Sequence, residues 1–201
     1  MEKKVTEWWL VRHAETVNPK KIVYGKLDLD IDIPTKTTCK ALSEILPKKP
    51  VWIATDLLRT QKTLNGILSV RGYADAEVNI EPAFAEQNFG EWEGRSSAEV
   101  WKQIKKSHKS WPADIRPPGG ETFSEVAERV KTAALSWSKI MLDRQVVAVL
   151  HAGSIRSFLS AAMGSEPTAA LSYSIDNLSI TKCDFFPPDK WRIGFVNRVV
   201  K

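Results

Sequence analysis

The chain has 201 residues, of which 43% are hydrophobic and 26% charged, with a formal net charge of +5 at pH 7. These values suit one ordinary globular domain and exclude a disordered or fibrous chain. No apolar run is long enough to cross a bilayer or to form a signal peptide, so we expect a cytoplasmic protein. The lysine-rich runs KKSHKS and LPKKP lack interleaved aromatic residues, so we expect solvated surface and neither a nucleic-acid nor a membrane partner. Cys39 and Cys183 lack C-x-x-C spacing and are expected to be free thiols.

Apolar runs separated by breakers predict the elements of the first half of the chain. EWWLV has the length of a short buried strand. KTTCKALSEIL is typical of a helix that stops before the breaker Pro47, and DLLRTQKTLNGIL has the apolar spacing of another helix. The expected elements are a strand at 7–11, a helix at 36–46, a strand at 51–55, a helix at 56–68 and a strand at 76–80.

The second half opens with a loop-rich segment at about 84–120, rich in glycine and proline, with one short helix near SAEVWKQI. We expect this segment to be a lid or specificity element within a single domain spanning 1–201. Alternation of strands and helices along the chain predicts an α/β fold, with a mostly parallel sheet covered by helices on both faces. The remaining elements are a helix at 121–142, a strand at 145–150, a helix at 153–163 and a closing hairpin at 177–185 and 191–197.

Charged and polar residues follow three of the predicted strands at the point where each strand ends. Arg12 and His13 follow the first strand, 55–59 follows the second, and His151 follows the strand at 145–150. Ligands of parallel sheets bind at the carboxyl ends of strands, so these groups should meet at one edge. The third histidine, His108, lies in a lysine-rich stretch and is expected at the surface.

The pairing of histidine with arginine indicates what such a site would bind. A neutral imidazole is a nucleophile, and a guanidinium holds phosphate or carboxylate oxygens with a planar fork. A histidine after a buried strand, taken alone, more often has a structural role and bonds to the backbone. Two histidines accompanied by Arg12 and Arg59 favour a site for an anion that an imidazole attacks.

Five sequence blocks, in order along almost the whole chain, resemble the histidine phosphatase superfamily, which has the phosphoglycerate mutase-like fold. RHAET followed by Asn18 is similar to the family's R-H-G-E-T-x-x-N, and LHAGSIR is similar to its H-G-x-x-R. Between them, TDLLRTQKT, EQNFGEWEGRS and PPGGETF resemble the S-x-L-x-R-A-x-x-T, E-x-x-F-G-x-W-E-G and P-x-G-E-S blocks. One short motif recurs by chance, but five ordered blocks are specific. The resemblance implies a three-layer α/β sandwich.

The resemblance also implies a role for each matching residue. His13 would be the nucleophile and form a phosphohistidine that water hydrolyses. Arg12, Arg59 and His151 would bind the phosphoryl oxygens. Glu86 matches the general acid that protonates the leaving alkoxide. The further substrate-binding groups implied are Thr16, Asn18 and the backbone N–H groups after His151, beginning with Ala152.

Several of these residues have a second interpretation that the sequence leaves open. Thr16 and Asn18 suit a turn as well as they suit ligand binding. Glu121 suits a charge in the first turn of a helix better than it suits a site. Ala14 replaces the family's usual glycine but keeps the backbone donor. Large aromatic side chains near the site could line a substrate cleft or pack in a core, and these are Trp92, Trp101 and Trp111.

The segment EQNFGEWEG resembles the phosphatase branch, notably alpha-ribazole phosphatase-like and broad-specificity phosphatases, rather than the E-R-x-Y-G of mutases. We therefore expect a metal-independent, histidine acid phosphatase-like phosphomonoesterase that acts on a small phosphorylated metabolite, with an alpha-ribazole phosphate-like compound as one candidate. No metal or cofactor is expected, because arginine and histidine supply the neutralising charge and no carboxylate cluster has metal-binding spacing. We expect a monomer or homodimer. A phosphoglycerate mutase-type phosphotransferase and an inactive phospho-ligand binding module stay open as alternatives.

Overall fold

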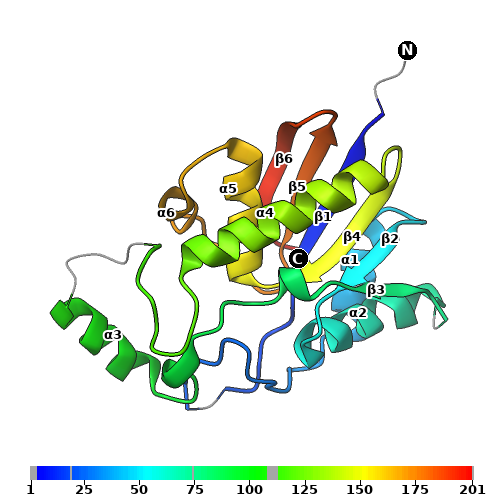
Figure 1. The fold of residues 1–201 in the computed structure, drawn as a ribbon. Coiled ribbons are helices and arrows are strands. Elements are labelled where there is room, and N and C mark those ends of the chain that lie inside the picture. Colours follow the sequence, from blue (N-terminus) through cyan, green and yellow to red (C-terminus); the bar gives the residue numbers. More distant parts are fainter. Residues whose placement is uncertain (1–3, 19, 74, 108–112, 201) are drawn as a thin grey trace.

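The computed structural model describes residues 4–18, 20–73, 75–107 and 113–200. Its strands form one sheet in the order β3-β2-β4-β1-β5-β6 (Figure 1). The four strands β1 to β4 run parallel, β5 runs antiparallel to β1, and β6 pairs antiparallel with β5. The predicted parallel sheet with a closing hairpin is therefore confirmed. The strands are β1 (Thr6–Arg12), β2 (Val51–Ala54), β3 (Val78–Ile80), β4 (Gln145–Leu150), β5 (Ile180–Phe186) and β6 (Lys190–Arg198).

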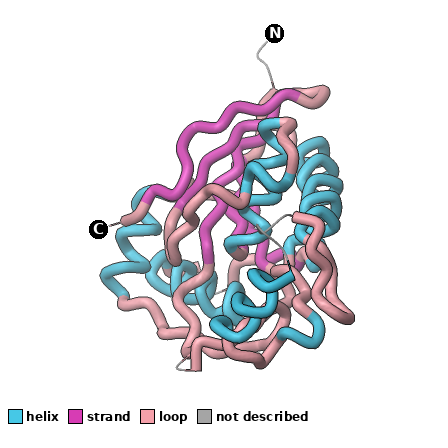
Figure 2. The backbone as a smooth tube through the Cα atoms, turned by 90° about the vertical axis from the view of Figure 1, so that its left-hand side faces the viewer, coloured by secondary structure: helices cyan, strands magenta, loops and turns pink. Residues whose placement is uncertain are grey.

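Helices cover both faces of this sheet, as the tube view in Figure 2 shows. The α/β sandwich expected from the sequence is thus the architecture observed. The helices are α1 (Lys36–Ile45), α2 (Leu58–Arg71), α3 (Ser97–Ser107), α4 (Phe123–Ile140), α5 (Ala152–Met163) and the short α6 (Pro167–Ala170), with the 3-10 turns η1 (Pro82–Phe84) and η2 (Gly90–Trp92).

The helix ends are set by local chemistry that the apolar pattern alone does not specify. The α2 helix begins two residues later than predicted, because Leu57 is extended and its N–H donates to the Thr55 hydroxyl. It ends at Arg71 and is followed by Gly72, whose φ of +67° glycine adopts without steric cost. The α4 helix begins with a capping box, in which Thr122 and Glu125 satisfy each other's backbone N–H groups.

Two apolar cores lie on opposite faces of the sheet, because successive residues of a strand point to opposite sides. On β4, Val146, Ala148 and Leu150 contribute to the core beneath α4 and α5. Val147 and Val149 contribute to the core beneath α1 and α2. The central strand is buried on both faces, which explains the continuous apolar run QVVAVL.

The α3 helix stands beside the sandwich rather than over it (Figure 1). It packs through a third, smaller apolar cluster that joins Val100 and Ile104 to Trp92 and Ile115. Part of the predicted lid segment therefore has a small core of its own. His108, predicted at the surface, and Trp111 lie outside the described residues.

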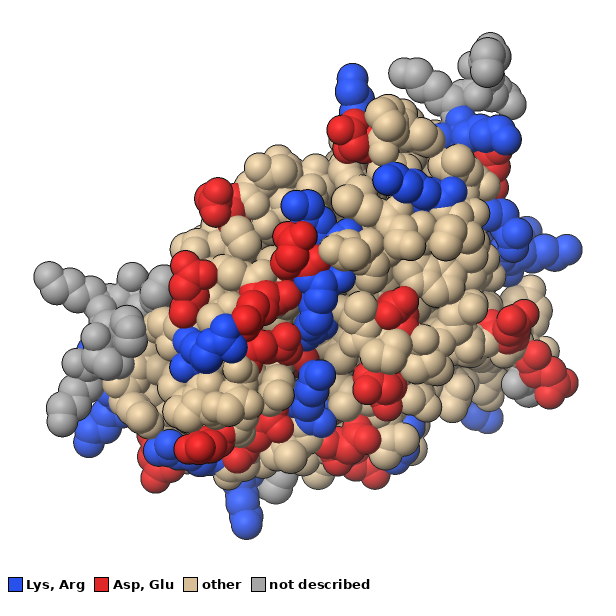
Figure 3. Space-filling view, viewed as in Figure 1, with Lys and Arg blue, Asp and Glu red and all other residues tan. Residues whose placement is uncertain are grey.

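On the face shown in Figure 3, lysine and arginine side chains are interspersed with aspartate and glutamate and do not form one basic patch. Solvent-exposed ion pairs of the molecule include Arg116 with Glu125 and Lys131 with Glu128. Among the described residues, no helix combines the length and apolar character needed to span a membrane.

Candidate active site

His13 lies immediately after β1, at the carboxyl edge of the sheet. Its side chain is 1% exposed, and its Nδ1 lies 2.6 Å from the carbonyl oxygen of Ala14. A carbonyl can only accept, so Nδ1 of the neutral ring carries the proton and Nε2 keeps its lone pair. The backbone of His13 is also fixed. Its N–H donates to the carbonyl of Leu150, and its own carbonyl accepts from the side-chain amide of Asn177.

Both histidines of this edge are neutral at pH 7. Burial and the nearby Arg59 guanidinium lower the pKa of His13 to about 3, with the hydrogen bond to Ala14 opposing and Arg12 adding to the shift. Burial also lowers the pKa of His151 well below its usual value, and Arg59 and His13 act in the same direction. A neutral imidazole is the form that can attack an electrophile.

His151 follows β4 and immediately precedes α5. Its ring centroid is 5.2 Å from that of His13. Arg59 Nε donates to His151 Nδ1 at 3.2 Å, so the ring proton is on Nε2, which donates to Thr55 Oγ1 at 3.0 Å. The predicted meeting of residues that follow β1, β2 and β4 is therefore confirmed for His13, His151 and Arg59.

Arg59 is fully buried in the first turn of α2. Besides its contact with His151, its two terminal nitrogens donate to the carbonyls of Gly25 at 2.6 Å and Leu27 at 2.9 Å. A guanidinium has five N–H groups, so two remain for an anion. The loop before α1 thus fixes the plane of this cation beside the histidine pair.

Arg12, at the end of β1, lies close enough to lower the pKa of both histidines. Its terminal nitrogen donates to the carbonyl of Ile175 at 2.5 Å. Its Nε is buried and has no hydrogen-bond partner in the part of the chain that the structure describes. Buried donors are rarely left unpaired, so this N–H marks a place where a ligand oxygen would be stabilised.

Glu86 follows η1 and reaches the start of α5. Its two carboxylate oxygens accept from the N–H groups of Gln87 at 3.0 Å and Gly153 at 3.3 Å. A Cβ atom at position 153 would lie 2.1 Å from Glu86 Oε1. Glycine is therefore required at 153 for this approach, which explains that position of the LHAGSIR block.

Two neutral donors near the site have partners within the protein. The backbone donor that Ala14 keeps donates to Thr63 Oγ1 at 2.9 Å. The Asn18 amide donates to the Ile22 carbonyl and accepts from the Ile22 N–H, each at 3.0 Å, and Thr16 forms a β-bridge with Ile31. The Asn18 contacts agree with its turn interpretation, whereas the β-bridge of Thr16 is made by its backbone and does not engage its hydroxyl.

Three residues with no predicted function contact the site. Thr55 fixes His151, and Asn177 holds the backbone of His13. Arg156 lines a cavity with Glu86. The sequence carried a signal for Arg156, because it is the last residue of the LHAGSIR block. Glu121 precedes α4 rather than lying in its first turn, and it pairs with Arg129.

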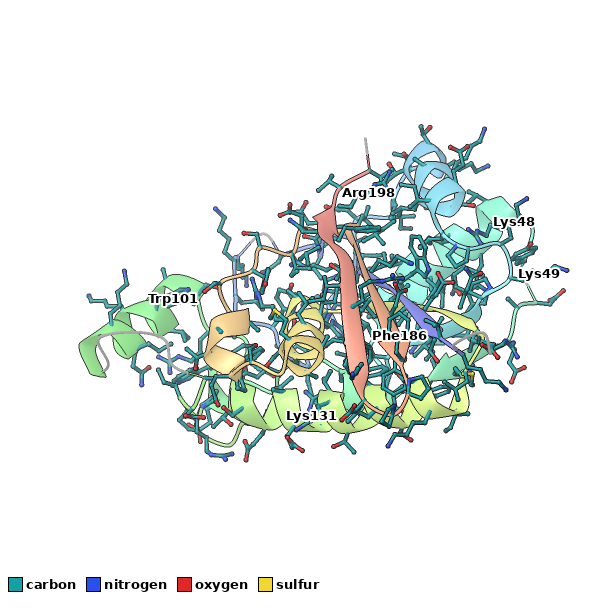
Figure 4. All side chains as sticks on the ribbon, turned by 90° about the horizontal axis from the view of Figure 1, so that it is seen from above. Lys48, Lys49, Trp101, Lys131, Phe186 and Arg198 are labelled. Carbon is teal, nitrogen blue, oxygen red and sulfur yellow. The ribbon has the colours of Figure 1, made fainter. Side chains whose placement is uncertain are left out.

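A cavity of about 420 Å³ opens beside Glu86. The two histidines are not among its lining residues, but Ala152 and Gly153, which directly follow His151, are, so the cavity lies beside the imidazole pair. Trp101 of α3 lines the cavity and lies at the end of the molecule away from Lys48 and Lys49 (Figure 4). Trp92, by contrast, packs in the small apolar cluster with Val100 and Ile104. Its lining residues are Val23, Glu86, Gln87, Phe89, Ser97, Val100, Trp101, Phe123, Ala152, Gly153, Arg156 and Leu171.

Within the described residues, no group of three or more histidine, cysteine, aspartate or glutamate side chains is placed to hold a metal ion.

Comparisons with known proteins agree with this geometry. A glucosyl-3-phosphoglycerate phosphatase of Mycolicibacterium vanbaalenii is 28% identical over 166 residues, which cover 77% of this chain and 73% of that protein. Phosphoserine phosphatase 1 of Hydrogenobacter thermophilus is 30% identical over 176 residues, which cover 85% of this chain and 82% of that protein. The crystal structure of an alpha-ribazole phosphatase from Shigella flexneri superposes on this chain with a TM-score of 0.77 at 22% sequence identity. The superposition covers 97% of this chain and 99% of that one. Residues 8–198 match the family model, and the chain belongs to the histidine phosphatase superfamily, branch 1.

Proposed function

We propose that this protein hydrolyses a small phosphomonoester through a phosphohistidine formed on His13. The observation that carries the proposal is the state of the His13 ring: Nδ1–H is held by the Ala14 carbonyl, and Nε2 keeps its lone pair among cationic groups. This arrangement supplies a neutral nucleophile next to groups that attract a phosphate dianion.

The reaction consists of two displacements at phosphorus. In the first, His13 Nε2 forms a bond to phosphorus, the bond to the ester oxygen breaks, and protonated Glu86 gives its proton to the leaving alkoxide. In the second, the Glu86 carboxylate takes a proton from water as the water oxygen attacks phosphorus. The phosphorus–nitrogen bond breaks, which releases inorganic phosphate and restores neutral His13.

The arginines bind the phosphoryl oxygens during both displacements. Arg12 offers its unpaired buried Nε, and Arg59 offers the two N–H groups that the protein leaves unused. A dianion beside His151 favours the protonated ring, whose Nδ1 then donates instead of accepting from Arg59. Arg59 and His151 therefore exchange their mutual contact for contacts with phosphoryl oxygens.

Hydrolysis fits the cavity better than mutase chemistry does. A mutase must hold a second phosphate dianion, whereas the described residues that line the cavity include one cation, Arg156. The two relatives described above are named as phosphatases. Both observations support water, rather than a bound phosphorylated alcohol, as the acceptor of the phosphoryl group.

The test is turnover of 4-nitrophenyl phosphate with and without EDTA, with inorganic phosphate measured as product. We expect hydrolysis that persists in EDTA and disappears in His13→Ala; loss of activity in EDTA would contradict the metal-free mechanism. Interconversion of 3-phosphoglycerate and its 2-phospho isomer, primed by the bisphosphate and faster than phosphate release, would indicate a mutase. Binding of inorganic phosphate with no turnover would indicate the inactive binding module.

A further inference from the structure

We infer that the cavity beside Glu86 binds a leaving alcohol that bears a carboxylate, and that Arg156 is the residue that binds this carboxylate. The inference rests on the proposed function, because Glu86 is taken to protonate the ester oxygen at the mouth of the cavity. Glu86 and Arg156 both line this space, so the alcohol that leaves from Glu86 enters the volume that Arg156 faces.

Arg156 is held by one side of its guanidinium only. Its Nε donates to the carbonyl of Tyr173 at 2.8 Å, which fixes the plane of the group. Its two terminal NH₂ groups have no hydrogen-bond partner in the described part of the chain. A guanidinium that is oriented by the protein and open at its terminal nitrogens presents the fork that binds a carboxylate in a bidentate manner.

With phosphate bound, the positive charges of the described residues around the site exceed the negative ones. Arg12, Arg59 and Arg156 bring three positive charges and protonated His151 brings a fourth, whereas a phosphate dianion brings two negative charges and Glu86 is neutral when it acts as the acid. Burial lowers the pKa of Arg156, an effect that the Glu86 carboxylate opposes and Arg12 reinforces. A substrate carboxylate would offset part of this excess, beside Arg156, after Glu86 has taken up its proton.

Apart from Ser97 and Gln87, the rest of the described cavity wall is mostly apolar, which favours an apolar carbon skeleton between the phosphate and the carboxylate. The side chain of Gln87 is already used, since its Nε2 donates to the carbonyl of Glu121 at 2.7 Å. Hydroxyl groups buried against apolar walls without partners cost free energy, which disfavours a polyhydroxylated sugar. The apolar side chains of the wall are Val23, Phe89, Val100, Trp101, Phe123 and Leu171.

The experiment compares substrates that differ in charge but not in shape. Benzyl phosphates carrying a ring carboxylate at the 3- or 4-position are each paired with their carboxamide twin, and kcat/KM is measured for both. The leaving alcohols of a pair are alike in volume and reactivity, so the ratio reports recognition of the charge. We expect wild-type protein to prefer a carboxylate by about 10- to 100-fold, the range of a charge-assisted hydrogen bond.

The variants assign this preference to one residue. Arg156→Gln should reduce the ratio to about 1, since the neutral amide replaces the cation. Arg156→Lys should restore part of the ratio, because a point charge replaces the fork. Arg144→Gln is the matched control, because it removes the same charge from an exposed arginine outside the cavity. Arg144 lies before β4, at the strand end opposite to the one that leads to Arg156, so this variant should keep the wild-type ratio.

The outcomes separate this inference from the proposed function. Equal kcat/KM for carboxylate and carboxamide twins in the wild type would overturn the inference and leave the phosphatase proposal intact. Hydrolysis of neither these esters nor 4-nitrophenyl phosphate would overturn the proposed function. An equal fall of the ratio in Arg144→Gln would assign the preference to net charge and also refute the role of Arg156. If Arg156→Gln fails to fold, the inhibition constants of the carboxylate and carboxamide benzyl phosphonates are compared on wild-type protein. Equal inhibition constants for the two would overturn the inference.

Discussion

Arg59 joins three parts of the chain through one side chain. It belongs to α2, contacts His151 at the end of β4, and binds the carbonyls of Gly25 and Leu27 in the loop before α1. Its charge also helps to keep His13 neutral. A single residue therefore positions one histidine, lowers the pKa of the other, and keeps two N–H groups for phosphate.

Replacement of Arg59 by lysine should lower kcat/KM for 4-nitrophenyl phosphate at least about 100-fold. Lysine keeps the charge but leaves the carbonyls of Gly25 and Leu27 and the His151 Nδ1 without their fixed donor. Arg71→Lys is the matched control in the same helix, since Arg71 bonds Ser43 and the carbonyls around Pro47. It should reduce stability but not the activity of the folded protein. A near-normal rate for Arg59→Lys would remove Arg59 from the phosphate site.

Glu86→Gln separates acid catalysis from binding at the same position. Glutamine keeps an oxygen that accepts from Gly153 but cannot supply the proton that an alkoxide needs. Loss of kcat/KM should be about 10²- to 10⁴-fold for benzyl phosphate and much smaller for 4-nitrophenyl phosphate, whose leaving group needs little protonation. Equal losses on the two esters would argue against Glu86 as the acid.

At the scale of elements, the junction between β4 and α5 brings the catalytic groups together. His151 is extended, with φ of −117° and ψ of 165°, and the helix begins at the next residue. The first turn of α5 then offers the Gly153 N–H to Glu86, and the next turn carries Arg156 into the cavity. One helix start thus connects the phosphate site to the leaving-group site.

Gly153→Ala should displace Glu86 and leave the helix intact. The added Cβ would lie 2.1 Å from Glu86 Oε1, whereas alanine is favourable in a helix. A displacement of about 1 Å can cost about 100-fold, so kcat/KM for benzyl phosphate should fall by that order, and less for 4-nitrophenyl phosphate. Gly194→Ala in β6 is the control, because its Cβ would meet Lys182 at 3.5 Å, an ordinary contact. Unchanged benzyl phosphate kinetics in Gly153→Ala would contradict the placement of Glu86.

For the whole molecule, burial of two neutral histidines beside arginines makes stability depend on pH. The pKa of His13 is about 3 in the folded protein and about 6.5 in the unfolded chain, so between these values the unfolded state binds more protons. The free energy of unfolding therefore falls as pH decreases from 6.5 towards 3. His151 shifts in the same direction and adds to this loss.

Urea unfolding at pH 7.5 and pH 5.0 tests this dependence. At pH 5.0 the shifted pKa of His13 costs about 2 kcal/mol of unfolding free energy relative to neutral pH, and His151 adds to this loss. His13→Asn removes one of these groups, so its unfolding free energy should fall by about 2 kcal/mol less than that of the wild type over the same interval. An equal fall in both proteins would show that His13 is not held neutral by the fold.

Much of this architecture follows from sequence periodicity. The buried run QVVAVL and the alternation of strands and helices predict the sheet. His13 and His151 are predicted at one edge because each follows the carboxyl end of a parallel strand. The hydrogen bonds of the site could not be predicted, because they join residues far apart in sequence through loop geometry. Asn177 contacts His13 across 164 positions, and the Thr63 hydroxyl accepts from the backbone N–H of Ala14.

The central claim is that His13 receives the phosphoryl group, and trapping the intermediate tests it most directly. Protein mixed with a ³²P-labelled aryl phosphate is quenched in alkali within milliseconds, digested, and mapped by mass spectrometry. The account predicts a base-stable, acid-labile label on the peptide that contains His13, and no label in His13→Ala. Label on any other residue, or stable labelling of His13→Ala, would contradict it.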